Sequence, residues 1–260
     1  KYICFYLREE EFNIKNTLLQ KREKIIRYKK NNFFKLFEEI FNNRLNIFDL
    51  SRDNDFLINN KKYFHLKNKD INNEIYLYII AKNSELFFCT GGGKSELAKL
   101  FKKPMLKVDH EYNVLNNFDF STLQDHIIFP YIYSKNLRKF LSIKDQFSNL
   151  DKIFPKSKNS TNFEFNCDDF ILVKNSEQDI LNLYKNYSFE TNKIQENRNV
   201  QNEIFNLKKY YVKKNLPDYF YYMNLKYPDN PIICKKFFEM NFDYNDYLNK
   251  KSENFIKELL

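Results

Sequence analysis

ELFFCTGGGKSELAKLF, residues Glu85 to Phe101, decides the fold and contains all three glycines of the 260-residue chain. Its first part, Leu86 to Cys89, is a short apolar run rich in aromatic residues, which is typical of a buried strand. The apolar residues between positions 97 and 101 recur at helical spacing. The stretch therefore predicts a strand, a glycine turn and a helix.

The glycine turn has the chemistry of a phosphate-binding site. Glycine lets a ligand approach the backbone, and the amides and dipole of a helix N-terminus attract an anion. Two hydroxyls and an ammonium flank the glycines. The predicted phosphate-binding residues of the turn are Thr90, Gly91, Gly92, Gly93, Lys94 and Ser95. The alternative is that the glycines only turn the strand tightly into the helix.

Two better-known nucleotide motifs do not fit this turn. A Walker A loop needs a glycine where Phe88 stands, and the spacing G-x-G-x-x-G of dinucleotide-binding proteins is not present either. Hydrolysis of a nucleotide at the Gly-Lys-Ser corner is therefore a weaker hypothesis.

Strand-like and helix-like segments alternate along the first two thirds of the chain, which predicts an α/β fold with a Rossmann-like, mainly parallel sheet and flanking helices. Ser142 and Ser176 are expected to cap two helices. The predicted strands are residues 2–7, 45–50, 63–66, 86–89, 104–108 and 170–174, and the predicted helices include 17–28, 33–42 and 72–82.

The pattern divides the chain into a Rossmann-like domain at 1–185 and a helical C-terminal extension at 186–260. Beyond about Asn186 only amphipathic helices are expected. The chain begins at Lys1 with strand-like residues, so we expect that a preceding N-terminal domain is absent from it.

Two further groups of polar residues follow predicted strands. Arg8 comes directly after the first strand, where a guanidinium can bind a phosphate, although it can equally pair with one of the glutamates at 9–11. Asp109 and Glu111 flank His110 after another strand and are candidate catalytic bases. The alternative for this second group is an ordinary polar loop.

Composition narrows the class of protein. The net charge of +9 suggests nucleic acid or an anionic membrane as partner, but Lys, Asn, Ile, Phe and Tyr are all abundant, as an AT-rich coding sequence produces. The four cysteines are far apart and form no C-x-x-C pair, which favours reduced thiols in a cytosolic protein and no bound metal. No apolar run is long enough to span a membrane.

Several short patterns, in this order along the chain, resemble the carboxyl-terminal half of a bacterial glycosyltransferase family associated with surface glycans, of the two-domain GT-B type. The likeness covers roughly residues 1 to 185. The matching pieces are CFYLR (4–8), IAK (80–82), LFFCTG (86–91), ELAKLFKKP (96–104), IFP (128–130), LSI (141–143) and VKNSEQDI (173–180).

The resemblance implies a Rossmann-like domain that holds the diphosphate of a nucleotide-sugar donor at its strand ends, without a bound metal or other cofactor. It also implies a glycan or lipid-linked acceptor and a cytoplasmic location with peripheral contact to the inner membrane. Family members carry a serine just ahead of the glycine in the turn, where this chain has Gly92. Thr90 or Ser95 would have to supply the hydroxyl.

The leading hypothesis is therefore an enzyme that transfers a sugar from a nucleotide donor in the synthesis of surface polysaccharide or glycoconjugate. No nucleic acid is expected as partner under this hypothesis. The alternative is a non-catalytic, basic module that binds nucleic acid through its lysines, whose mark is a steep dependence of affinity on salt.

Overall fold

The computed structural model describes residues 1–7, 30–51, 58–66, 74–90, 93–108, 125–155 and 165–190, together with positions 201–202, 206, 210, 213–214, 232–234 and 237. Several predictions fall outside these described residues. They are the helix over 17–28, the phosphate-binding residues Arg8, Gly91 and Gly92, and the candidate bases Asp109 and Glu111.

Within the described part of the chain, seven strands form one sheet in which every neighbouring pair is parallel. The order is β10-β6-β5-β4-β1-β2-β3, and its first six strands by chain order follow the 3-2-1-4-5-6 order of doubly wound nucleotide-binding folds. The predicted Rossmann-like α/β fold is confirmed. The strands are β1 (Tyr2–Tyr6), β2 (Asn46–Asp49), β3 (Tyr63–His65), β4 (Leu86–Cys89), β5 (Met105–Lys107), β6 (His126–Ile127) and β10 (Ile232–Ile233).

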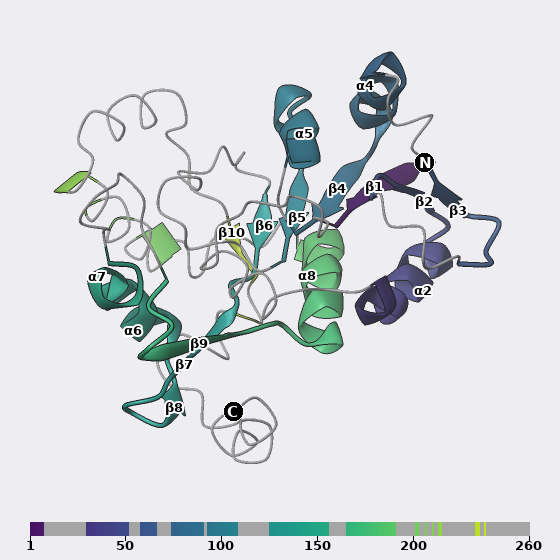
Figure 1. Cartoon of the computed structure of the whole chain (residues 1–260). Coiled ribbons are helices and arrows are strands. Elements are labelled where there is room, and N and C mark those ends of the chain that lie inside the picture. Colours follow the sequence, from purple (N-terminus) through teal and green to yellow (C-terminus); the bar gives the residue numbers. More distant parts are fainter. Residues whose placement is uncertain are drawn as a thin grey trace.

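Helices cover both faces of this sheet (Figure 1). One face carries the 3-10 helix η1 (Lys30–Phe33), α2 (Phe34–Asn42) and α8 (Glu177–Glu190), and the other carries α4 (Glu74–Asn83) and α5 (Glu96–Leu100). α2 and α8 lie side by side, since Lys185 pairs with Glu39 at 3.2 Å. Successive side chains of a strand point to opposite faces, and β1 accordingly contributes to both apolar layers.

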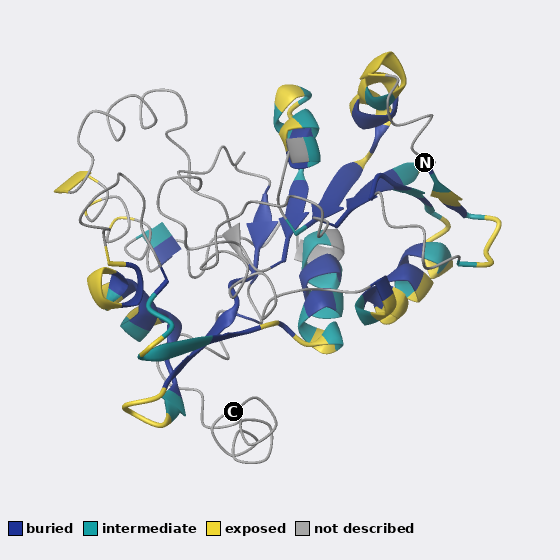
Figure 2. Ribbon diagram, in the orientation of Figure 1, coloured by how far each residue is buried: buried dark blue, intermediate teal, exposed yellow. Residues whose placement is uncertain are grey.

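The layer under α2 is dominated by phenylalanine. Phe5 of β1 makes edge-to-face contacts with Phe33 and Phe37, with ring centroids 5.1 and 4.9 Å apart, and all three side chains are fully buried. Such aromatic pairs contribute about 0.5–1.5 kcal/mol each beyond the area they bury. The sheet strands and the inner sides of the helices are correspondingly buried (Figure 2).

A second, antiparallel sheet follows the first. In the described residues it contains β7 (Tyr131–Ser134), β8 (Lys139–Phe140) and β9 (Phe170–Val173), in the order β8-β7-β9. The strand predicted at 170–174 is confirmed, although it belongs to this sheet and not to the parallel one. Pro130, which has no amide hydrogen to donate, stands between β6 and β7.

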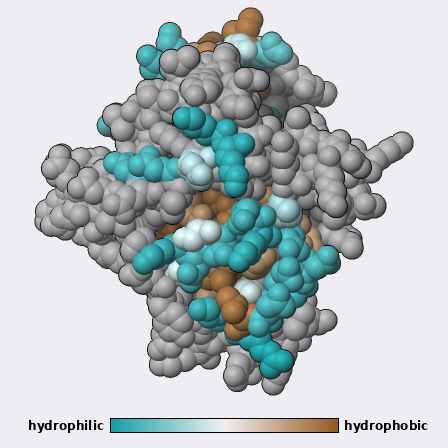
Figure 3. All heavy atoms as spheres, turned by 90° about the vertical axis from the view of Figure 1, so that its left-hand side faces the viewer, coloured by the Kyte–Doolittle hydropathy of each residue, from teal (hydrophilic) through white to brown (hydrophobic). Residues whose placement is uncertain are grey.

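Two short helices, α6 (Ile143–Ser148) and α7 (Leu150–Ile153), accompany the second sheet. The predicted cap of α6 is confirmed, because the Ser142 hydroxyl accepts a hydrogen bond from the Asp145 amide at 3.0 Å. The cap of α8 is confirmed too, with the Asp179 amide donating to the Ser176 hydroxyl at 3.2 Å. Seen from the side of α6 and α7, the described surface is largely polar with smaller apolar areas between (Figure 3).

The sequence predicts only helices beyond Asn186, but this segment also contains a strand. Its described positions between 201 and 214 are helical, but Ile232 and Ile233 form β10, which pairs with His126 and Ile127 of β6. Two residues carry too little periodicity to be recognised as a strand. Where the first domain ends, predicted at residue 185, stays a prediction. None of the helices in the described residues is long and apolar enough to cross a bilayer.

Candidate functional site

The strand order of the parallel sheet reverses between β1 and β4, which are neighbours although two strands separate them in the chain. Their carboxyl ends meet: Tyr6 lies opposite Cys89, and the Thr90 amide donates to the Tyr6 carbonyl at 3.2 Å. In open α/β sheets, ligands bind outside the carboxyl ends of the strands at such a reversal point. The two sequence segments predicted to bind phosphate, Arg8 and the glycine turn, directly follow these two strand ends.

The glycine turn leads into a helix, as predicted, though the helix is short. Gly93–Ser95 form a 3-10 turn and α5 adds only five residues. Thr90 is half-buried at the end of β4, whereas Ser95 is only 2% exposed and its side chain does not cap α5. Thr90 is therefore better placed than Ser95 to present a hydroxyl to a ligand.

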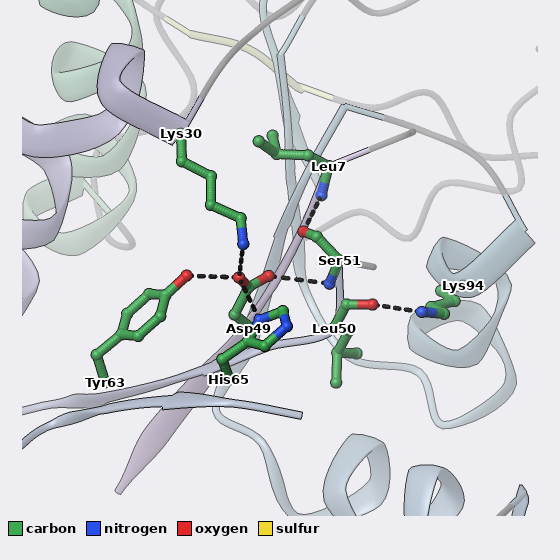
Figure 4. Close-up of polar contacts among 8 residues, drawn as sticks. All are labelled: Leu7, Lys30, Asp49, Leu50, Ser51, Tyr63, His65 and Lys94. Carbon is green, nitrogen blue, oxygen red and sulfur yellow. Dashed lines mark hydrogen bonds and ion pairs between the residues drawn. The ribbon is translucent and has the colours of Figure 1, made fainter. Parts of the chain in front are cut away.

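Lys94 lies where three strands end. Its ammonium donates to the carbonyl oxygen of Leu50, which follows β2 (Figure 4). It also lies 5.5 Å from the centre of the Tyr6 ring at the end of β1. The side chain thus crosses from the turn after β4 to the ends of β1 and β2. A positive charge is placed at the edge of the sheet where the sequence predicted one, and it is held there by contacts within the protein.

A buried polar group near this edge is Asp49, which the sequence analysis did not select. Its carboxylate is completely buried. Oδ2 is 2.7 Å from Lys30 Nζ and 3.0 Å from His65 Nδ1, and it accepts a hydrogen bond from the Tyr63 hydroxyl at 2.5 Å (Figure 4). Oδ1 accepts from the Ser51 amide at 2.9 Å.

These contacts determine how the group ionises. Burial raises the pKa of Asp49, but its polar contacts outweigh burial and hold that pKa at about 2. These contacts are the hydrogen bond from His65, the positive charge and hydrogen bond of Lys30, and the hydrogen bond from Ser51. Burial, followed by the neighbouring Asp49 charge, raises the pKa of Tyr63 well above its usual range. At neutral pH Asp49 is therefore a carboxylate and Tyr63 a neutral donor.

The buried Asp49 cluster is closed to substrate. His65 Nε2 is inaccessible to solvent and has no hydrogen-bond partner among the residues that the structure describes. Because Lys30 and Asp49 are 3% and 0% exposed, neither can meet a ligand from solution. One sequence signal pointed here: Asp49 is the charged residue in the strand predicted at 45–50.

The end of β2 also holds the end of β1. The Leu50 amide donates to the Phe5 carbonyl at 2.8 Å, and the Leu7 amide donates to the Ser51 hydroxyl at 3.0 Å. Three consecutive residues at the end of β2 thus make three different contacts (Figure 4). Asp49 pairs with the buried Lys30, the Leu50 carbonyl accepts from the Lys94 ammonium, and the Ser51 hydroxyl accepts from the Leu7 amide after β1.

The structure also shows the state of the cysteines. All four cysteines lie in the described residues and are free thiols, and burial raises the pKa of Cys4 to about 12. Among the described residues, no group of three His, Cys, Asp or Glu side chains is arranged to hold a metal ion.

The strand order defines the class of protein: a doubly wound, Rossmann-like α/β domain. No model of a protein family matches the sequence, and no curated protein matches it. Among solved structures the chain is similar to the UDP-GlcNAc 2-epimerase of Methanocaldococcus jannaschii, determined in complex with UDP-GlcNAc and UDP. The likeness has 22% identity and a TM-score of 0.29, and covers 42% of this chain and 29% of the epimerase chain. The fold assignment accordingly rests on the strand order.

Proposed function

We propose that this chain binds the diphosphate of a nucleotide sugar at the ends of β1 and β4, and that it serves to transfer the sugar to a glycan or lipid-linked acceptor. The observation that carries the proposal is the pairing of Tyr6 with Cys89 at the reversal point of the sheet. This pairing puts the carboxyl ends of β1 and β4 side by side. In the sequence, Arg8 follows β1 and the glycine turn follows β4, and the sequence analysis selected these two segments separately.

The chemistry of sugar transfer needs positive charge at this point. Departure of the nucleoside diphosphate builds negative charge on the phosphates, which fixed cations and backbone amides stabilise. Lys94 supplies an ammonium at the sheet edge. A charged phosphate oxygen is a stronger acceptor than the neutral Leu50 carbonyl, so a bound diphosphate can compete for the Lys94 ammonium.

The acceptor hydroxyl needs a base, for which Asp109 and Glu111 remain our candidates. Both follow β5 in the chain, and β5 lies next to β4 in the parallel sheet. The carboxyl ends of parallel neighbours lie on one edge, so β5 ends on the same side of the sheet as β4. The cytoplasmic location, the contact with the inner membrane and the independence from metal remain parts of the proposal.

The proposal is tested by a thermal-shift screen of the protein against UDP, GDP, CDP and ADP, followed by calorimetric titration of the best stabiliser. A ligand that binds only the folded state raises its stability with the logarithm of its concentration over Kd. Loss of one charge-assisted contact to phosphate is expected to weaken binding about tenfold or more in Lys94→Ala and in Arg8→Ala.

Lys61→Ala is the matched control. Lys61 is an exposed lysine in the turn before β3, at the opposite edge of the same sheet. The substitution Lys61→Ala removes one positive charge, as Lys94→Ala does, but lies away from the proposed site. The affinity of this variant for the diphosphate should therefore equal that of the wild type. If no diphosphate stabilises the wild type, or if both Lys94→Ala and Arg8→Ala bind as tightly as Lys61→Ala, the proposed function is wrong.

A further inference from the structure

Ser51 joins two features of the molecule that are far apart in sequence. Its hydroxyl accepts a hydrogen bond from the amide of Leu7 at 3.0 Å, across 44 positions of the chain. Its own amide donates to Asp49 Oδ1 at 2.9 Å. Ser51 is 1% exposed, so water cannot replace either contact without opening the structure.

The amide that Ser51 holds is the one immediately before Arg8. Leu7 is the first residue after β1. Consecutive Cα atoms are about 3.8 Å apart, and the Leu7 amide is the last described contact before Arg8 in the chain. A cation that must meet a phosphate depends on such a support, because a misplacement of about 1 Å can cost two powers of ten in rate.

Ser51 is itself held by the buried cluster. Lys30, Tyr63 and His65 all contact Oδ2 of Asp49, which leaves Oδ1 directed at the Ser51 amide (Figure 4). A side-chain oxygen that accepts from the amide two residues later is the geometry of an Asx turn. The turn is therefore fixed by a charge that is fully paired inside the protein.

The same turn also contacts Lys94. The Leu50 carbonyl, between Asp49 and Ser51, accepts from the Lys94 ammonium. One three-residue segment thus supports the chain before Arg8 and the side chain of Lys94, although these belong to different strand ends.

We propose that Ser51 is a positioning residue for the diphosphate site: anchored by Asp49, its hydroxyl fixes the end of β1 so that Arg8 meets the phosphate. This inference rests on the proposed function. It assigns no contact between Ser51 and the ligand, and so predicts that Ser51 acts on binding through Arg8.

A double-mutant cycle tests this dependence. Ser51→Ala, Arg8→Ala and the double variant are titrated with the diphosphate that binds the wild type best, and their folding is checked by circular dichroism. Coupled residues show non-additive effects, whereas independent ones add. Ser51→Ala should weaken binding about tenfold when Arg8 is present, and about twofold or less when Arg8 is already alanine.

Ser84→Ala is the matched control for a purely structural effect. Ser84 is also a serine 1% exposed, and its hydroxyl also bonds to backbone, donating to the Ala81 carbonyl at 2.9 Å, but it precedes β4 at the opposite edge of the sheet. It should lower the melting temperature and leave Kd unchanged. Should Ser51→Ala lose its fold, Ser51→Cys, which keeps a weak acceptor at the position, is used in the same cycle and should couple to Arg8 likewise.

The outcomes separate this inference from the proposed function. Equal losses of affinity from Ser51→Ala in both backgrounds, or no loss in a folded variant, overturn the positioning role while diphosphate binding stands. If the wild type binds no nucleoside diphosphate, the proposed function fails first and the role of Ser51 falls with it.

Discussion

The carboxyl ends of β2 and β4 lie on the same edge of one sheet, with only β1 between them, yet they are constructed differently. At the end of β2 a fully buried carboxylate meets Lys30 and three hydrogen-bond donors inside the protein. At the end of β4 there is a half-buried threonine, a glycine turn and a lysine that reaches across the edge.

The difference indicates that the two strand ends have different roles. A buried charge must be paired to be tolerated, so the cluster around Asp49 commits its charges to holding the fold. The turn after β4 contributes backbone and one cation at the edge, which is what an anionic ligand needs. Substitutions of the charges in the cluster around Asp49 should therefore act mainly on stability, and those in the turn after β4 mainly on binding.

The largest effect is expected from Asp49→Asn, which keeps the shape of the side chain and removes its charge. Lys30, 3% exposed, then loses its ion pair with Asp49. Breaking a buried ion pair by removing one partner costs about 3–5 kcal/mol, which urea denaturation measures as a lower midpoint at unchanged slope.

Glu85→Gln is the control for Asp49→Asn. Glu85 pairs with Lys1 at 3.7 Å, but those two side chains are 47% and 74% exposed. An exposed pair contributes about 0–1 kcal/mol. If Asp49→Asn is no more destabilising than Glu85→Gln, the charges at the end of β2 do not stabilise the fold and the comparison fails.

The pH dependence of stability gives the next largest effect. The pKa of Asp49 is about 2 in the folded protein, against an ordinary value of 3.8. Because the folded state binds the proton less readily than the unfolded chain, this carboxylate stabilises the fold above pH 3.8, and that contribution is lost as the pH falls toward 2. It amounts to about 2 kcal/mol.

The measurement is the free energy of unfolding of the wild type and of Asp49→Asn between pH 6 and pH 2. Carboxylates common to both proteins cancel in the difference. The stability advantage of the wild type should narrow by about 2 kcal/mol over this range, and an advantage that stays constant would show that Asp49 keeps an ordinary pKa in the folded state.

The sequence predicted the parallel part of the fold well, because its strands are compact apolar runs that end in polar residues or glycine. Residues 86–89 form β4 as predicted, and 63–66 contain β3. β9 was predicted as a strand, but the antiparallel sheet that contains it was not. The strands β6, β8 and β10 were not predicted, since two residues carry too little periodicity to separate a strand from a loop.

The candidate site was predictable only where local chemistry marks it. Three adjacent glycines before Lys94 are visible in a linear sequence. Asp49, Lys30, Tyr63 and His65 are not, because they belong to η1, β2 and β3 and meet only after these elements have packed. What brings Lys30 to Asp49 is the packing of η1 against the sheet, which no local pattern encodes.

The smallest expected change in stability is that of Lys94→Ala, which tests directly whether the ends of β2 and β4 have different roles. Lys94 is half-buried, contacting the Leu50 carbonyl and the Tyr6 ring. A cation at a partly solvated edge contributes about 1 kcal/mol or less to stability, well below the loss expected for Asp49→Asn. Urea denaturation of the two variants in parallel measures the two losses in free energy of unfolding.

If Lys94→Ala destabilises as much as Asp49→Asn, Lys94 is a second structural cation, and any loss of diphosphate affinity in Lys94→Ala would report damage to the fold. A stable Lys94→Ala that binds weakly would instead place its contribution in the ligand complex, because a side chain that scarcely supports the free protein can affect affinity only through what the bound state adds.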